Sequence, residues 1–139
     1  YFEHEVGTDQ VVAGGTVTPI LAEITSGDFD ITQKRTAQGQ TIGMPDLRGD
    51  GEFLMKIRRI IPDFISQTGS ATITLLLRNY PNDTASSSSL GPFTVTTSTD
   101  KVDTRARARA IALKISNTAA SQDWKLGTFR LDIQPDGRR

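Results

Sequence analysis

Hydrophobic residues recur at every second position along most of this chain, in short runs separated by glycine, proline and small polar residues. Alternate positions of a β-strand face opposite sides of a sheet, so the pattern predicts strands with one buried face and no amphipathic helix. The spacing of these runs predicts about seven strands. We therefore expect an all-β fold, built as a two-sheet antiparallel β-sandwich of the jelly-roll or Ig-like kind.

The first predicted strands lie near the N-terminus. Ile20, Ala22 and Ile24 share one face of an early strand, and Phe29 and Ile31 open a short second piece. A polar stretch over residues 32–50 follows, with three glycines, one proline and few large apolar residues. Such a composition favours a long surface loop, and its length suggests a role in interactions.

The middle of the chain contains two longer predicted strands. The apolar face of the first consists of Phe53, Met55, Ile57 and Ile61, it is interrupted at Arg59, and Pro62 ends the strand. The second carries Ile73, Leu75 and Leu77 on one face. The turn at residues 67–70 predicts that these two strands pair as a hairpin or meander.

Near the end of the chain, the apolar positions switch from even to odd residue numbers. Ile111, Leu113 and Ile115 are expected to face the core, as are Phe129, Leu131 and Ile133. Trp124 and Leu126 occupy the opposite phase, so we expect a shift of register near Gly127 and Thr128.

Arginine and alanine alternate strictly from Arg105 to Ala110. In a strand this places Arg105, Arg107 and Arg109 on one face, roughly 6.6 to 6.8 Å apart. From Arg105 onward the chain has eight Lys/Arg against three Asp/Glu, although its total formal charge is zero. These arginines, with Arg138 and Arg139 at the end, are therefore candidate interface residues. They are expected to bind carboxylates, either Asp100 and Asp103 of the same chain or those of a neighbouring subunit.

Catalytic and metal chemistry has little basis in the sequence. The chain has no cysteine and one histidine, His4, which stands between Glu3 and Glu5, and it has no G-x-S-x-G motif. Asp28 and Asp30 are weak candidates for a Ca²⁺ site, and turn chemistry after Gly27 is the alternative explanation. We expect no enzyme activity, no cofactor and no metal. The longest apolar runs fall far short of the roughly 20 residues that span a bilayer, so no membrane contact is expected.

Several segments together resemble the C-terminal domain of tailed-bacteriophage virion proteins from the tail hub or nozzle of short-tailed phages and prophages. The resemblance spans nearly the whole chain and rests on residues 4–9, 26–31, 59–64 and 104–107 and on the stretch from Trp124 to Arg139.

The resemblance implies a non-enzymatic component of a ring-shaped tail assembly, found in the virion and made in the cytoplasm of the bacterial host. The single domain of residues 1–139 would then be the C-terminal part of a longer protein. Its partners would be copies of itself and other tail proteins, with non-specific contact to packaged DNA as a further option. The alternative is a sandwich that binds carbohydrate or a host receptor, with Trp124 and Tyr80 stacking on the ligand.

Overall fold

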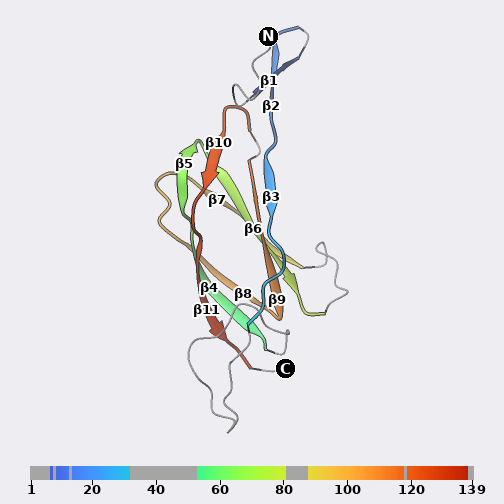
Figure 1. Ribbon diagram of the computed structural model, residues 1–139, viewed down its shortest axis with the longest axis vertical. Helices are drawn as coiled ribbons and strands as arrows, with labels where there is room; N and C mark the ends of the chain where they lie inside the picture. The colour runs from blue at the N-terminus through green and yellow to red at the C-terminus, as the bar shows by residue number, and fades with distance from the viewer. Residues whose placement is uncertain are drawn as a thin grey trace.

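The computed structural model describes residues 7, 9–12, 14–31, 53–80, 88–117 and 119–137. Eleven strands and no helix lie in these residues, and every strand pairing between them is antiparallel (Figure 1). The all-β class is therefore confirmed. The expectation of about seven strands is wrong, because five short strands of three to five residues accompany the longer ones. The predicted loop at residues 32–50 lies outside the described residues.

Two larger sheets form the body of the molecule. The four-stranded sheet has the order β3-β9-β6-β7, with β3 at Glu23–Thr25, β9 at Ala110–Ser116, β6 at Ala71–Arg78 and β7 at Ser89–Val95. The three-stranded sheet has the order β11-β4-β8, with β11 at Arg130–Pro135, β4 at Met55–Ile61 and β8 at Val102–Ala108.

Two strand pairs extend the body along its long axis. One pairs β5 (Phe64–Thr68) with β10 (Asp123–Leu126). The other is the N-terminal hairpin, made of β1 (Asp9–Val12) and β2 (Thr16–Pro19), which projects beyond the sheets at one end (Figure 1).

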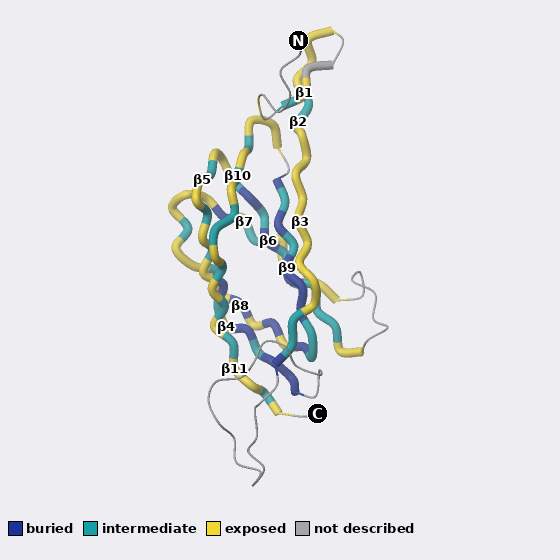
Figure 2. The backbone as a smooth tube through the Cα atoms, viewed as in Figure 1, coloured by how far each residue is buried: buried dark blue, intermediate teal, exposed yellow. Residues whose placement is uncertain are grey.

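The core lies between the facing sides of the two larger sheets (Figure 2). Both sheets contribute side chains with no more than 1% of their surface exposed, and these include Met55, Ile57, Ile60, Ile73, Leu75, Ala106, Ala108, Ile111 and Ile115. The aromatic rings of Phe64, Trp124 and Phe129 pack against this core, and Phe64 contacts each of the other two edge to face. Burial of this apolar surface is the main source of stability.

Strand β4 contains a bulge that changes which isoleucine is buried. Its pairing with β11 shifts register, because Ile57 pairs with Ile133 and Arg59 pairs with the adjacent Asp132. One extra residue, Arg58, therefore lies on the β4 side and the alternation restarts. As a result Ile60 is fully buried and Ile61 is 38% exposed. The prediction that Ile61 continues the apolar face was wrong for this reason.

The predicted pairing of the two middle strands is also wrong. Residues 64–68 form the separate strand β5 between them, and β4 pairs with β8 and β11, while β6 pairs with β7 and β9 in the other sheet. The two strands face each other across the core. Their predicted inward faces are confirmed, since Ile57, Ile73 and Leu75 are fully buried.

The early segment does not supply an apolar face to the core. Ile20 and Ile24 are about half exposed and Leu21 is 67% exposed. This segment is held instead by the buried side chain of Asn117, whose Oδ1 accepts a hydrogen bond from the N–H of Ala22 at 2.6 Å. The Nδ2 group of Asn117 donates to the carbonyl oxygen of Ile20 at 3.1 Å. A polar clamp therefore replaces the expected apolar packing.

The phase change between the last two apolar runs is confirmed. Strand β10 ends at Leu126, β11 begins at Arg130, and Trp124, Leu126 and Phe129 all pack against the core despite their mixed parity. At the break, the N–H of Gly127 donates to the carbonyl oxygen of Asp63 at 2.8 Å. A Cβ atom on Gly127 would lie 2.9 Å from that oxygen, so the close approach requires glycine.

We expect Gly127→Ala to lower the free energy of unfolding by about 1–3 kcal/mol, because the backbone of Asp63 must move to admit the methyl group. Denaturant titration followed by Trp124 fluorescence measures the change. Gly27→Ala is the matched control, since a Cβ there meets no atom within 4 Å, and it should change the stability far less. Equal stability of the two variants would contradict the close-packing argument.

Candidate functional site

Strand β8 places its alanines on one face and its arginines on the other, as the sequence predicts. Thr104, Ala106 and Ala108 point into the core, while Arg105 and Arg107 are exposed on the opposite face. The small alanines allow β8 to pack closely against the facing sheet, and the alternation leaves the arginines on the outside.

The neighbouring strand adds basic residues to the same side of the sheet. Lys56 lies directly opposite Arg107, and Arg59 lies opposite Asp103. Directly opposite side chains in an antiparallel pair have Cβ atoms about 4.5–5.5 Å apart, so these groups interact. We call the outward side of β4, β8 and β11 the cationic face; its basic residues are Lys56, Arg58, Arg59, Arg105, Arg107 and Arg130.

Arg59 and Asp103 form an ion pair across the two strands, with Arg59 Nε 2.8 Å from Asp103 Oδ1. This hydrogen bond holds the pKa of Asp103 below its ordinary value and raises the pKa of Arg59. Both side chains are largely exposed, so solvent and salt weaken the pair and it chiefly fixes side-chain orientation.

Arg107 is also paired within the chain. Its guanidinium forms an ion pair with Asp136, which follows β11. The backbone brings Asp136 there, because its N–H donates to the carbonyl oxygen of Leu54 at 2.7 Å, just before β4. The expectation that the arginines pair with carboxylates of the same chain is thus confirmed for Arg107, although the partner is neither Asp100 nor Asp103.

Arg58 and Arg105 differ from their neighbours. Both side chains are exposed, and neither forms an ion pair or side-chain hydrogen bond with any residue that the structure describes. They line a shallow hollow of about 550 Å³ together with Lys56, Arg59, Asp103, Thr104 and Asp132. Two guanidinium groups on this face are therefore available to an anionic partner.

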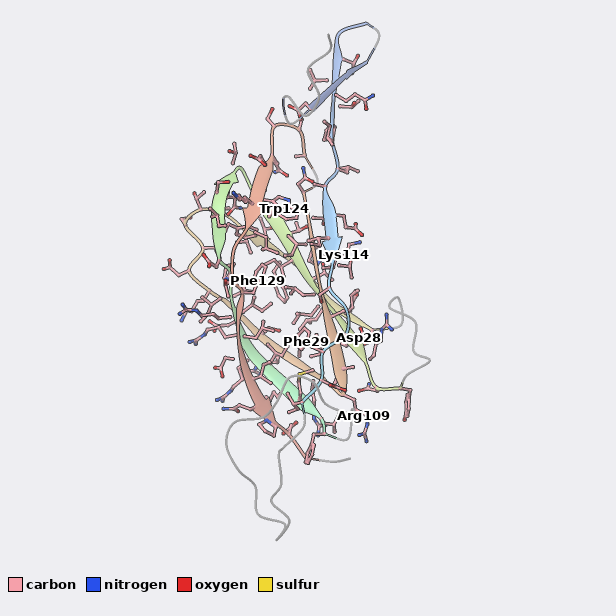
Figure 3. The ribbon with its side chains drawn as sticks, viewed as in Figure 1. Asp28, Phe29, Arg109, Lys114, Trp124 and Phe129 are labelled. Carbon is pink, nitrogen blue, oxygen red and sulfur yellow. The ribbon has the colours of Figure 1, made fainter. Side chains whose placement is uncertain are left out.

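Arg109 does not belong to this row. Strand β8 ends at Ala108, and Arg109 occupies the one-residue connection to β9, where its N–H donates to the carbonyl oxygen of Arg78 at 3.1 Å. Figure 3 shows Arg109 at the end of the sheets, away from the N-terminal hairpin. The expected row of three evenly spaced arginines is therefore wrong for Arg109. Arg138 and Arg139 lie outside the described residues.

The structure does not gather a metal site from Asp28 and Asp30. Asp28 forms an ion pair with Arg78, with Oδ2 of Asp28 3.1 Å from Nη1 of Arg78. Between the two aspartates, Phe29 bridges to Ile111 of β9 through backbone hydrogen bonds of 2.9 and 3.0 Å. Among the described residues, no group of three or more His, Asp or Glu side chains is placed to hold a metal ion.

The two candidate ligand-binding aromatic residues lie in different surroundings. Trp124 packs edge to face on Phe64, with ring centroids 6.3 Å apart, and points toward the core region (Figure 3). Tyr80 is 70% exposed just after β6. They come from different sheets, and no hollow found in the described residues is lined by both.

Sequence reasoning missed the contribution of β4 to the cationic face. The signal was present, because Lys56, Arg58 and Arg59 occur within one predicted strand. Recognising its meaning required knowing that β4 pairs with β8 and that a bulge directs both Arg58 and Arg59 away from the core.

We expect Arg59→Gln to raise the pKa of Asp103 toward its ordinary value, because the hydrogen bond from Arg59 is the main cause of the lowering. A depressed folded-state pKa means that the pair stabilises the fold above the unfolded-state pKa and ceases to do so as the pH falls through the folded-state pKa. Titration of the carboxyl carbon of Asp103 by NMR measures the shift. Arg58→Gln is the control and should leave this midpoint in place; an unchanged midpoint in Arg59→Gln would contradict the assignment.

Comparison with known proteins adds no family to this description. No protein-family model matches the sequence, and no curated protein matches it. The part of the chain that the structure describes also contains no helix long and apolar enough to cross a membrane.

Proposed function

We propose that this domain is a non-enzymatic structural component of a bacteriophage tail, in its hub or nozzle, where repeated copies contact one another and other tail proteins. In this proposal the protein resides in the virion and is made in the cytoplasm of the bacterial host. The two larger sheets would be the layers of a jelly-roll or Ig-like β-sandwich. The resemblance of the sequence supports the identity of the assembly, and the cationic face supports the mode of contact.

The observation that carries the proposal is the pair of exposed arginines, Arg58 and Arg105, without partners in the described chain. A guanidinium group binds a carboxylate through two parallel hydrogen bonds, which sets orientation as well as attraction. Both groups stand on neighbouring strands of one sheet, so their relative position is fixed by the backbone. This arrangement fits a contact that must repeat with the same geometry in every copy.

The register of the face adds a second argument. Lys56 and Arg107 are directly opposite each other, and like charges in that position destabilise a sheet. The ion pair with Asp136 relieves part of this repulsion, and an acidic partner on the face would relieve more.

Carboxylates of a protein suit this face better than nucleic-acid phosphates. Asp103 and Asp132 line the same hollow as the arginines, and Asp136 lies at its side of the sheet. These negative charges would repel a continuous phosphate backbone, whereas protein side chains can place single carboxylates between them.

We expect the full chain to self-associate at low ionic strength and to dissociate in about 1 M salt, where charges are screened beyond about 3 Å. Light scattering of the purified protein at several concentrations measures its mass under both conditions. The double variant Arg58→Glu/Arg105→Glu should remain at the mass of one chain at low salt, because the face then repels carboxylates.

Lys125→Glu is the matched control, since Lys125 is exposed on β10, outside the cationic face, and it should associate like the unmodified chain. A mass of one chain at every salt and protein concentration would argue against self-assembly. Salt-sensitive association that survives in the double variant would place the contact elsewhere.

A further inference from the structure

One edge of the cationic face is open. Strand β8 pairs with β4 on one side and, among the described residues, with no strand on the other. In an antiparallel strand, every second N–H and C=O group points away from the paired neighbour. The outer edge of β8 thus presents a row of backbone groups able to bind one more strand.

A hollow of about 310 Å³ lies beside this edge, between β8 and β7. Its walls are Leu90 and Phe93 from β7 and Asp103, Thr104 and Arg105 from β8. The side chain of Thr104 is only 9% exposed, and its buried Oγ1 atom has no hydrogen-bond partner among the described residues. The hollow therefore offers apolar surface, from Leu90 and Phe93, beside the free edge of β8.

Strand β7, on the opposite side of the hollow, is poorly suited to pair with an added strand. Strand β7 contains Pro92, which has no backbone N–H, and its neighbour Gly91 has a φ of +119°. Proline on an edge strand blocks regular pairing. Of the two edges that border the hollow, β8 is therefore the one suited to accept a strand.

The N-terminal sequence of the chain has the matching pattern. Glu3 and Glu5 stand two residues apart, as Arg105 and Arg107 do, and Phe2, His4 and Val6 occupy the alternate positions. In an added strand, the two glutamates would lie on the outward side against the arginines, and the alternate residues would turn toward the hollow. Both parallel and antiparallel registers allow this match.

In the pairing that we consider, the partner strand comes from another copy. Gly7 lies beside Ile20 and Trp124, at the end of the molecule where the N-terminal hairpin projects, whereas β8 runs through the body (Figure 1). Asp9 is fixed at that end, where its two carboxylate oxygens accept hydrogen bonds from the N–H and Oγ of Ser121 at 2.6 and 2.8 Å. The segment before Asp9 therefore starts from this end of the molecule, and the four residues from Asp9 back to Glu5 span at most about 14 Å.

We propose that residues 2–6 of one copy pair with the free edge of β8 in the next copy, with Glu3 and Glu5 bound to Arg105 and Arg107. This inference rests on the proposed self-assembly and identifies the acidic partner. Two different surfaces then meet at each contact, so the contact is heterologous and repeats from copy to copy, closing a ring when the rotation allows.

Complementary charge reversals in the full chain test the pairing. We expect Arg105→Glu/Arg107→Glu and Glu3→Lys/Glu5→Lys each to weaken self-association by about tenfold or more, because each places like charges at the contact. Mixed in equal amounts, the two variants should associate again, since each N-terminal segment then meets an edge of opposite charge. Light scattering of each variant and of the mixture gives the result, and thermal unfolding confirms that both variants are folded.

The control exchanges two exposed charges on β10, Asp123→Lys/Lys125→Glu, and should associate like the unmodified chain. If the unmodified chain associates and the mixture does not, the pairing is overturned while the proposed assembly through the cationic face stands. If Arg105→Glu/Arg107→Glu associates as strongly as the unmodified chain, the arginines serve only to keep the edge of β8 apart from other strands, and the pairing is again overturned. A chain that stays monomeric overturns the proposed assembly itself.

Cross-linking adds a direct readout, because the chain contains no cysteine. A disulfide between Glu5→Cys in one copy and Arg105→Cys in another is expected for the antiparallel register, and one between Glu5→Cys and Arg107→Cys for the parallel register. Glu5→Cys with Lys125→Cys is the control. Cross-links formed equally in all three combinations would overturn the pairing.

Discussion

The two-residue period of strand β8 determines both the inside and the outside of this protein. Ala106 and Ala108 point inward and are fully buried, while Arg105 and Arg107 point outward. The inward positions admit only small side chains, because a larger group would press on the facing sheet. The outward positions have no such limit and carry the longest basic side chains. A shift of β8 by one residue would bury guanidinium groups and expose the core, so the packing also fixes the position of the charges.

Local periodicity was sufficient to predict which side chains of β6, β8 and β9 face the core. It failed in β4, where a bulge makes Ile60 the buried residue in place of Ile61. A bulge is a property of two paired strands, and one strand read alone does not reveal it. The pairing of the strands could not be predicted from local periodicity either. The turn at residues 67–70 suggested that adjacent strands pair, whereas β5 pairs with the distant β10.

In the candidate site, too, local sequence predicted some features, and others depended on how the strands pair. The Arg-Ala alternation predicted an exposed basic row correctly for Arg105 and Arg107, and wrongly for Arg109, because β8 ends one residue earlier. The contribution of Arg58 and Arg59 depends on the register between β4 and β8, which joins residues more than forty positions apart. The tail assembly inferred from the resemblance remains a prediction, since the contacts of a single chain do not test it.

The clamp at Asn117 gives the molecule two levels of stability. The body depends on buried apolar surface, whereas the segment around Leu21 has little, and the carboxamide of Asn117 holds it through the backbone of Ile20 and Ala22. Regions with few buried contacts open at a lower free energy than the whole fold. The joint between the N-terminal hairpin and the sheets therefore opens at a lower free energy than the sheets, once the hydrogen bonds from Ser121 to Asp9 are also broken. In the proposed assembly, small differences in the angle between successive copies would be absorbed at this joint without loss of the fold.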